Sequence, residues 1–251
     1  MSEATQLNKQ NFIFNLEKKL SLENFKVFNN LIRQRLERKP IAYLTGKKEF
    51  WKYEFYVNRD VLIPRPDTEL IIEQTLKLFQ NKNGLRMLEV GVGSGCIILS
   101  LLKERKDFYG IGIDVNKKSL DICKINADKL NVLNKIKLLK SDIDNFNYGK
   151  YDLIISNPPY IKKFDLKYLE KDVIGFEPKL ALDGGIEGLS EIRKVIRKSS
   201  ELIKKRGTLI LEVGFDQKEK VKKILKNNNF YISKVIKDLG KNNRCIICNK
   251  I

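Results

Sequence analysis

The tetrapeptide Asn157-Pro158-Pro159-Tyr160 stands directly after the apolar run "YDLII", where a buried strand would end. Asn157 offers a side-chain carbonyl, and Pro158 offers a backbone carbonyl without a competing N–H. Two such acceptors can hold both N–H groups of an amide or aryl amine and direct the nitrogen lone pair toward an electrophile. Tyr160 offers a flat wall for stacking the substrate group. Asn157, Pro158 and Tyr160 are therefore the catalytic candidates, although Asn-Pro and Pro-Pro also occur in ordinary turns.

A glycine loop earlier in the chain predicts where the electrophile binds. Gly91, Gly93 and Gly95 follow the stretch "RMLEV" and precede a helical pattern. Glycine tolerates positive φ and lets a ligand approach the backbone N–H groups at a helix N-terminus. Asp114 ends the next apolar stretch, "GIGID", 19 residues after Gly95, where an acid can hold both hydroxyls of a ribose. The loop and the acid together predict a nucleoside cofactor.

The spacing of the glycines distinguishes between cofactors. G-x-G-x-G is tighter than the dinucleotide fingerprint G-x-G-x-x-G, and no Walker lysine follows it, which disfavours NAD and ATP. The loop resembles that of S-adenosylmethionine-dependent methyltransferases instead. This resemblance implies that Gly91-Val92-Gly93-Ser94-Gly95 cradles the cofactor, with Asn157 beside it. It further implies that Glu89 lies near the methionine amino group, and that Asp142 and Ile143 lie near the adenine.

Residue composition excludes several classes of chemistry. The chain has no histidine, which excludes histidine-dependent triads and most catalytic zinc sites. Four cysteines are too few for a disulfide framework, and the C-x-x-C pair Cys245/Cys248 lacks the further ligands of a zinc site. No metal is therefore expected. The pair is interpreted as part of a terminal strand, and Cys96 and Cys123 as small core residues on helices.

Charge and hydropathy bear on partners and location. The formal net charge is +18, from 49 Lys and Arg against 31 Asp and Glu. Such an excess suggests weak contact with RNA or the ribosome, but lysines spread over solvated faces would give the same total. No apolar run approaches the roughly 18 residues of a membrane span, and the start, "MSEATQLNKQ", lacks the apolar stretch of a signal peptide. A soluble cytoplasmic protein without membrane contact is expected.

A regular alternation of strand-like and helix-like patterns begins near residue 84. It predicts an α/β fold, a Rossmann-like and mostly parallel seven-stranded sheet with helices on both faces. The expected strands are 86–92, 108–115, 135–142, 151–156, 207–213, 231–238 and 244–249, and the expected helices are 93–105, 116–130, 189–205 and 217–227.

The region before the sheet has a different pattern. Residues 1–40 are predicted to be helical, with Ser21 as an N-cap and Pro40 closing the stretch. The aromatic and β-branched residues that follow predict a hairpin, and "IPRPDTE" predicts a stiff turn into a helix that Asp67 or Thr68 can cap. The predicted domains are a helical substrate-docking domain (1–45), a hairpin and linker (46–75) and a methyltransferase domain (76–251).

Several stretches along almost the whole chain resemble the HemK/PrmC family, the N5-glutamine methyltransferases of peptide chain release factors. The Asn-Pro-Pro-Tyr motif is shared with adenine-N6 and guanine-N2 methyltransferases, whereas "IPRPDTE" and "ALDGGIEGL" are far more selective. The matching stretches are "PIAYLTGKKEF", "VLIPRPDTE", "LEVGVGSGCI", "SNPPYI", "EPKLALDGGIEGL" and "LILEVGFDQ".

The resemblance implies a reaction and a substrate. It implies methyl transfer from S-adenosylmethionine to the glutamine amide nitrogen in the Gly-Gly-Gln motif of a release factor. Asn157 and Pro158 would bind the amide, and Pro159 and Tyr160 would shape its slot. Arg65, in "IPRPDTE", would lie over the cofactor site, either on the substrate side or in a salt bridge that joins the domains.

Three departures from the family pattern accompany the match. The N-terminal helical region is shorter than usual, Asp67 stands where glutamate is more frequent, and Ile143 stands where an aromatic residue often flanks the adenine. Two rival interpretations remain. A nucleic-acid amino-methyltransferase acting on adenine N6 or guanine N2 agrees with the charge, but the region before the sheet is small for target recognition. A basic RNA-binding module without catalysis would not need the complete set of glycines, Asp114 and Asn-Pro-Pro-Tyr.

Overall fold

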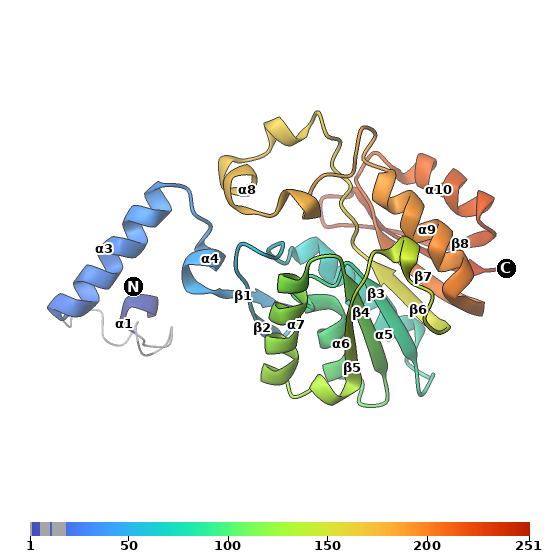
Figure 1. Ribbon diagram of the computed structural model, residues 1–251, viewed down its shortest axis with the longest axis horizontal. Helices are drawn as coiled ribbons and strands as arrows, with labels where there is room; N and C mark the ends of the chain where they lie inside the picture. Colours follow the sequence, from blue (N-terminus) through green and yellow to red (C-terminus); the bar gives the residue numbers. More distant parts are fainter. Residues whose placement is uncertain (1, 6–10, 12–18) are drawn as a thin grey trace.

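A seven-stranded sheet with helices on both faces forms most of the molecule (Figure 1). The structure is a computed structural model that describes residues 2–5, 11 and 19–251. The strands run in the spatial order β5-β4-β3-β6-β7-β9-β8, and β9 is antiparallel to both of its neighbours while the other pairs are parallel. Their bounds are β3 Arg86–Val90, β4 Tyr109–Asp114, β5 Ile136–Lys140, β6 Tyr151–Ser156, β7 Ile203–Glu212, β8 Phe230–Lys237 and β9 Asn243–Lys250. The predicted fold class is confirmed.

Alternating side chains of the central strands pack into two separate cores. Leu153 and Ile155 of β6 belong to one core, and Ile154 between them belongs to the other, because successive side chains of a strand point to opposite faces. The first core contains residues of α5, α6 and α7, and the second contains residues of α9 and α10. The helices are α5 Glu69–Leu78, α6 Cys96–Glu104, α7 Lys117–Lys129, α8 Lys171–Phe176, α9 Ser190–Leu202 and α10 Lys218–Asn227.

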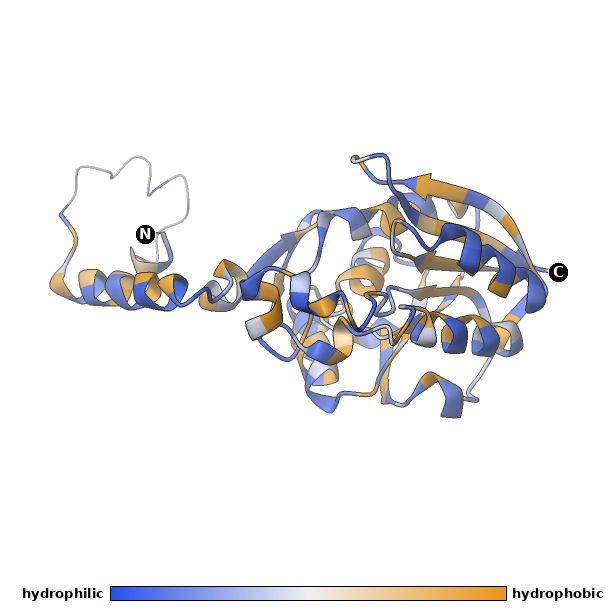
Figure 2. Ribbon diagram, turned by 90° about the horizontal axis from the view of Figure 1, so that it is seen from above, coloured by the Kyte–Doolittle hydropathy of each residue, from blue (hydrophilic) through white to orange (hydrophobic). Residues whose placement is uncertain are grey.

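A helical segment and a hairpin precede the sheet. The predicted N-cap is confirmed, since the Asn24 N–H donates to Ser21 Oγ at 3.1 Å where α3 begins. Both views show α3 apart from the sheet, and none of its residues is buried (Figures 1 and 2). The predicted helix over residues 1–40 falls in part on residues 1, 6–10 and 12–18, which lie outside the described residues. The elements are α1 Ser2–Thr5, α3 Leu22–Leu36, α4 Ile41–Thr45, β1 Lys47–Phe50 and β2 Tyr53–Tyr56.

Two local predictions are wrong. The helix expected over 189–205 ends at Leu202, because Ile203 is buried and pairs with Tyr151 of the neighbouring strand β6. The expected cap of α5 is absent: neither Asp67 nor Thr68 makes a side-chain cap hydrogen bond there. The hydroxyl of Thr68 points to a different partner instead, which is described below. The short 3-10 helices are η1 Pro66–Thr68, η2 Leu133–Lys135, η3 Ile143–Asn145, η4 Leu166–Tyr168 and η5 Lys179–Ala181.

Candidate functional site

A cavity of about 460 Å³ lies at the carboxyl ends of the parallel strands. This is the edge at which open α/β sheets bind their ligands. The lining combines the segments after β3, β4, β5 and β6 with the linker that follows the hairpin. Among the predicted site residues the lining contains Arg65, Glu89, Gly91, Val92, Gly93, Ser94, Asp114, Asp142, Ile143, Asn157, Pro158 and Pro159. Two predicted site residues, Gly95 and Tyr160, are outside this lining.

The pairing of β3 with β6 brings the two principal motifs together. Val90 is the register partner of Ser156, so Gly91 and Asn157 are the next residues on two adjacent parallel strands. The Ser156 hydroxyl donates to the Val90 carbonyl at 2.8 Å and ties the two strand ends together. The glycine loop and the Asn-Pro-Pro-Tyr corner therefore share one cavity because of strand order alone.

The glycine loop has the geometry of a cradle. Gly91, Gly93 and Gly95 have φ values of +74°, +53° and +80°, which L side chains rarely adopt. A Cβ added at Gly91 would meet no atom within 4 Å, so the backbone faces open cavity there. At Gly95 the glycine is needed for packing, since a Cβ would approach Cys123 Sγ to 2.6 Å. The loop thus leaves room for a ligand that contacts the backbone directly, as the predicted S-adenosylmethionine requires.

Glu89 places a carboxylate at the floor of the cavity. The side chain is 2% exposed, and its Oε2 accepts a hydrogen bond of 3.0 Å from the N–H of Ile98 in the first turn of α6. Burial raises the pKa of Glu89 well above its ordinary value, with a smaller contribution from the Asp114 carboxylate. A cationic amino group at this position would offset the cost of a buried carboxylate, which fits the methionine end of the predicted cofactor.

Asp114 uses its two carboxylate oxygens to order the loop. Its Oδ2 accepts from the N–H of Gly93 at 3.0 Å, and its Oδ1 accepts from the N–H of Asn116 at 2.9 Å. Burial raises its pKa, and the backbone hydrogen bonds oppose this increase. Oxygens of an ionised carboxylate can accept further hydrogen bonds, so Asp114 retains capacity for ribose hydroxyls.

Asp142 and Ile143 lie at the third strand end. The Asp142 carboxylate accepts from the N–H of Asp144 at 2.9 Å and caps η3. Ile143 is 5% exposed and contributes an apolar surface to the cavity. The position agrees with the adenine contact that the resemblance implies, which stays a prediction.

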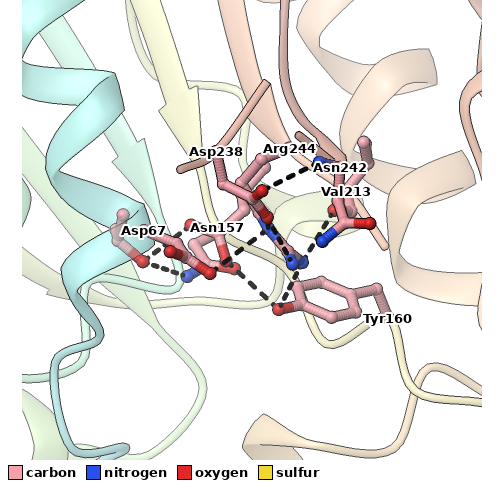
Figure 3. A network of polar contacts seen from close by, with 9 residues as sticks. Asp67, Asn157, Tyr160, Val213, Asp238, Asn242 and Arg244 are labelled. Carbon is pink, nitrogen blue, oxygen red and sulfur yellow. Dashed lines mark hydrogen bonds and ion pairs between the residues drawn. The ribbon is translucent and has the colours of Figure 1, made fainter. Parts of the chain in front are cut away.

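One hydrogen bond orients the Asn157 side chain at the corner, and a second fixes its partner Thr68 (Figure 3). Its Nδ2 donates to Thr68 Oγ1 at 3.2 Å, and Thr68 Oγ1 donates to Glu212 Oε2 at 2.6 Å. Within the described residues, neither Asn157 Oδ1 nor the Pro158 carbonyl accepts a hydrogen bond from the protein. Both acceptors that the predicted chemistry uses are therefore available to a ligand.

Tyr160 contributes to the corner in a different way from the one expected. Its hydroxyl donates to Glu212 Oε1 at 3.2 Å, and Arg244 Nη1 donates to the same hydroxyl at 3.5 Å. Burial raises the pKa of Tyr160, and the nearby Glu212 carboxylate raises it further. Tyr160 is not part of the cavity lining. Its predicted stacking on the substrate group therefore stays a prediction.

Residues to which the sequence analysis assigned no role contact the backbone of the Asn-Pro-Pro-Tyr corner. Gln217 is 2% exposed, and its Nε2 donates to the carbonyls of Tyr160 and Gly188, each at 2.9 Å. A Cβ at Gly188 would approach the Tyr160 carbonyl oxygen to 2.3 Å, and one at Gly184 would approach the Pro159 carbonyl oxygen to 2.8 Å. These residues belong to "ALDGGIEGL" and "LEVGFDQ", so the only signal in the sequence was their place in stretches shared with the family.

Arg65 forms an ion pair with Glu177, in which its guanidinium donates to Oε1. The Glu177 side chain is 1% exposed, and its Oε2 also accepts from the N–H of Ile63 at 3.2 Å. Arg65 also lines the cavity. The structure thus shows the salt bridge between the linker and the segment before α9, and the substrate-side role stays a prediction.

The linker is fastened over the cavity by α7. Asn126 is fully buried, and its side chain accepts from the N–H of Tyr56 at 2.7 Å and donates to the carbonyls of Tyr56 and Ser94. Ser119 Oγ donates to the carbonyl of Asp60 at 3.1 Å. Asn126 therefore joins the hairpin to the glycine loop, a function that its position within a helix did not reveal.

Three of the four cysteines lie in the core, as predicted for Cys123, whereas Cys96, at the start of α6, is only partly buried and lines the cavity. Cys123, Cys245 and Cys248 are buried, Cys245 and Cys248 lie in β9, and burial raises the pKa of Cys245 to about 12. In residues 2–5, 11 and 19–251 no group of three or more His, Cys, Asp or Glu side chains could hold a metal ion. Over the same residues, no helix has the length and apolar character of a membrane span.

Two family models match the chain. The model described as the methyltransferase domain matches residues 81–246, and the model described as the PrmC N-terminal domain matches residues 1–46. Among solved structures, a methyltransferase from Pyrococcus furiosus has a TM-score of 0.59 and 20% identity, over 88% of this chain and 98% of that one. At this identity the likeness concerns the fold.

Curated relatives are more similar in sequence. The release factor glutamine methyltransferase of Buchnera aphidicola (Acyrthosiphon pisum) is 36% identical, over 100% of this chain and 89% of that protein. The one from Caulobacter vibrioides is 35% identical, over 92% of this chain and 80% of that protein. A bifunctional methyltransferase of Rickettsia typhi is 36% identical over 94% of this chain, which spans only 49% of that longer protein.

Proposed function

The chain belongs to the release factor glutamine methyltransferases, which depend on S-adenosylmethionine, and on this premise we propose that it methylates a release factor. The acceptor is the side-chain amide nitrogen, N5, of the glutamine in the Gly-Gly-Gln motif. The cavity geometry supports this proposal through one observation: the glycine loop and the Asn157 amide line the same space.

Asn157 and Pro158 act as acceptors for the substrate amide. A carboxamide nitrogen is a poor nucleophile because its lone pair is delocalised into the carbonyl. Hydrogen bonds from both N–H groups to Asn157 Oδ1 and the Pro158 carbonyl favour a tetrahedral nitrogen and fix the direction of its lone pair. Positioning of this kind can supply several of the roughly 7–11 kcal/mol available from orientation.

The cavity wall orients the other reactant. When bound, S-adenosylmethionine supplies an electrophilic methyl carbon on a positively charged sulfur. The loop from Gly91 to Ser94, together with Glu89 and Asp114, holds the two ends of such a molecule, and Arg65 of the linker lines the same cavity. No histidine is needed, because an amide nitrogen that has gained a methyl group is acidic and loses its proton readily.

The region before the sheet is the part of the chain that we assign to binding of the release factor. We assign residues 1–45 to contact with the release factor, 46–75 to the hairpin and linker, and 76–251 to catalysis. The match of residues 1–46 to the PrmC N-terminal domain supports this division. The net charge of +18 agrees with weak contact to RNA or the ribosome. A release factor as the substrate supports the cytoplasm as the place where the protein works.

Mass spectrometry of the Gly-Gly-Gln peptide tests the proposal. Purified release factor incubated with the protein and S-adenosylmethionine should gain one methyl group on glutamine. Asn157→Ala should lower the rate by at least roughly 100-fold, comparable to loss of one preorganised polar group. Asn228→Ala, in the turn after α10, is the matched control and should retain the rate. Methylation of DNA or ribosomal RNA in place of the release factor would contradict the proposal and favour the nucleic-acid alternative.

A further inference from the structure

We propose that Thr68 and Glu212 are positioning residues that fix which end of the Asn157 amide faces the cavity. The inference rests on the proposed function, in which Asn157 Oδ1 accepts an N–H of the substrate glutamine. Neither residue was among the predicted site residues, and neither needs to touch the substrate. Their effect passes through two hydrogen bonds that join three distant parts of the chain.

The buried carboxylate of Glu212 sets the direction of the chain of hydrogen bonds. Glu212 is 2% exposed at the end of β7, and it accepts from Thr68 Oγ1 at 2.6 Å and from the Tyr160 hydroxyl at 3.2 Å. Burial raises the pKa of Glu212, and the hydrogen bonds from Thr68 and Tyr160 and the charge of Arg244 oppose this increase. Because Arg244 donates to the Tyr160 hydroxyl, the tyrosine proton is directed to Glu212, and the ionised carboxylate can only accept. Thr68 must therefore donate its single hydroxyl proton to Glu212.

The hydroxyl of Thr68 passes this constraint to Asn157. Because its proton is already used, Thr68 Oγ1 can only accept from the amide, and a side-chain amide donates only through its nitrogen. Asn157 Nδ2 lies 3.2 Å from Thr68 Oγ1, as this requires. Oδ1 is then left for the cavity. Oxygen and nitrogen of an amide are distinguished by such a network, so the orientation follows from Glu212.

The Tyr160 hydroxyl that donates to Glu212 itself accepts from a cation, Arg244. Arg244 donates to the Tyr160 hydroxyl at 3.5 Å and to the Val213 carbonyl at 3.4 Å, and it forms ion pairs with Asp238 at 3.0 Å and Asp67 at 3.6 Å (Figure 3). The group is nearly enclosed, since the Arg244 side chain is 14% exposed. With one oxygen bonded to Thr68 and the other to Tyr160, the Glu212 carboxylate has little freedom to turn away from Thr68.

The orientation of Asn157 determines which side chain can enter. With Oδ1 toward the cavity, the site accepts an N–H and therefore suits glutamine. With Nδ2 toward the cavity, the site donates, and it would suit the carboxylate of glutamate. A donor facing another donor costs a buried hydrogen bond. The pair Thr68 and Glu212 would thus contribute both to the rate and to discrimination between glutamine and glutamate.

The test compares three threonine variants in the full-length protein. Thr68→Val removes the hydroxyl, Thr68→Ser retains it, and Thr75→Val removes another fully buried hydroxyl, one that donates to the Ile71 carbonyl within the same helix. Each variant is assayed for kcat and KM with release factor. Each is also assayed for inhibition by a release factor whose Gly-Gly-Gln glutamine is replaced by glutamate. Thermal unfolding is measured in parallel.

Thr68→Val should lower kcat by roughly 10–100-fold, as misplacement of a reacting group does, with the KM for S-adenosylmethionine unchanged. Inhibition by the glutamate-bearing release factor should become stronger relative to wild type. Thr68→Ser should restore both, and Thr75→Val should change neither. If Thr68→Val does not fold, Glu212→Gln provides the same measurement, because an amide there can also donate and no longer imposes one direction.

The inference is overturned if wild type methylates release factor but Thr68→Val keeps its kcat and its discrimination against glutamate. It is also overturned if Thr68→Val and Thr75→Val lose activity alike, since that indicates a general packing effect. Failure of wild type to methylate release factor would instead contradict the proposed function itself. The two failures are therefore separated by the wild-type assay.

Discussion

The backbone N–H of Gly93 donates a hydrogen bond of 3.0 Å to Oδ2 of Asp114, so the acid at the end of β4 shapes the glycine loop after β3. The same carboxylate accepts from Asn116 through Oδ1. Both Gly93 and Asp114 line the cavity. An acidic residue expected to bind ribose thus also orders the loop that is expected to bind the rest of the cofactor.

Asp114→Asn should weaken binding of S-adenosylhomocysteine, the demethylated cofactor, by roughly 10–100-fold. Gly93 and Asn116 donate to different oxygens of Asp114, so the NH2 group of asparagine would face one of these two donors. Hydrogen bonds to a charged group contribute about 1.5–3 kcal/mol each. Isothermal titration calorimetry measures the change. Asp121→Asn, on the exposed side of α7, is the control and should bind as wild type does. Unchanged affinity in Asp114→Asn would remove Asp114 from the cofactor site.

Gly91→Ala should lower cofactor affinity more than it lowers stability. Its new methyl group would enter the open cavity, and its φ of +74° costs about 1–2 kcal/mol for an L residue. Gly84→Ala is a matched control, because Gly84 has φ of +67°, open space around it and no contact with the cavity. Both variants should lose a similar amount of thermal stability, while only Gly91→Ala loses binding. Equal binding in the two variants would show that the loop does not cradle the cofactor.

Glu89→Gln should make the cofactor-free protein more stable at neutral pH and bind S-adenosylhomocysteine less tightly. Burial raises the pKa of Glu89 above its ordinary value of 4.5, so the folded state keeps this proton to a higher pH than the unfolded chain. The free energy of unfolding therefore falls as pH rises from about 4.5 through the raised pKa, and it remains lower above that window.

Thermal unfolding of wild type and Glu89→Gln across pH measures this contribution. The glutamine carbonyl can still accept from the N–H of Ile98, so the difference between the two proteins isolates the charge. The difference in Tm should be small below pH 4.5 and should increase with pH in favour of the variant. A difference that stays constant with pH would mean that burial of the Glu89 charge does not cost stability.

A double-mutant cycle at Arg65 and Glu177 should separate the two expected roles of Arg65. If Arg65 acts through its ion pair, Arg65→Ala should lower kcat/KM in wild type and have little further effect in a Glu177→Gln background. Glutamine at 177 can still accept from the N–H of Ile63, which limits structural damage. A full additional loss from Arg65→Ala in that background would indicate direct contact with the substrate.

Local sequence patterns predicted the helices and strands well where the apolar residues of a segment keep a single period, that of a strand or that of a helix. The apolar stretches of β3, β4 and β6 and the glycines after β3 identified both the sheet and its binding edge. The prediction failed at Ile203, where a helical pattern continues but pairing with Tyr151 forms a strand. It failed again at Thr68, where a residue typical of helix caps donates to Glu212, 144 residues away in the sequence.

The sequence by itself determined the fold class, the family and the chemical groups at the corner, because hydrophobic period, glycine spacing and residue type are properties of neighbouring residues. Only the tertiary structure decided how those groups point. Asn157 is oriented by Thr68, which is 89 residues away, and Arg65 pairs with Glu177, which is 112 residues away. The direction of a hydrogen bond depends on which donor and acceptor meet after folding, and no local pattern carries that information.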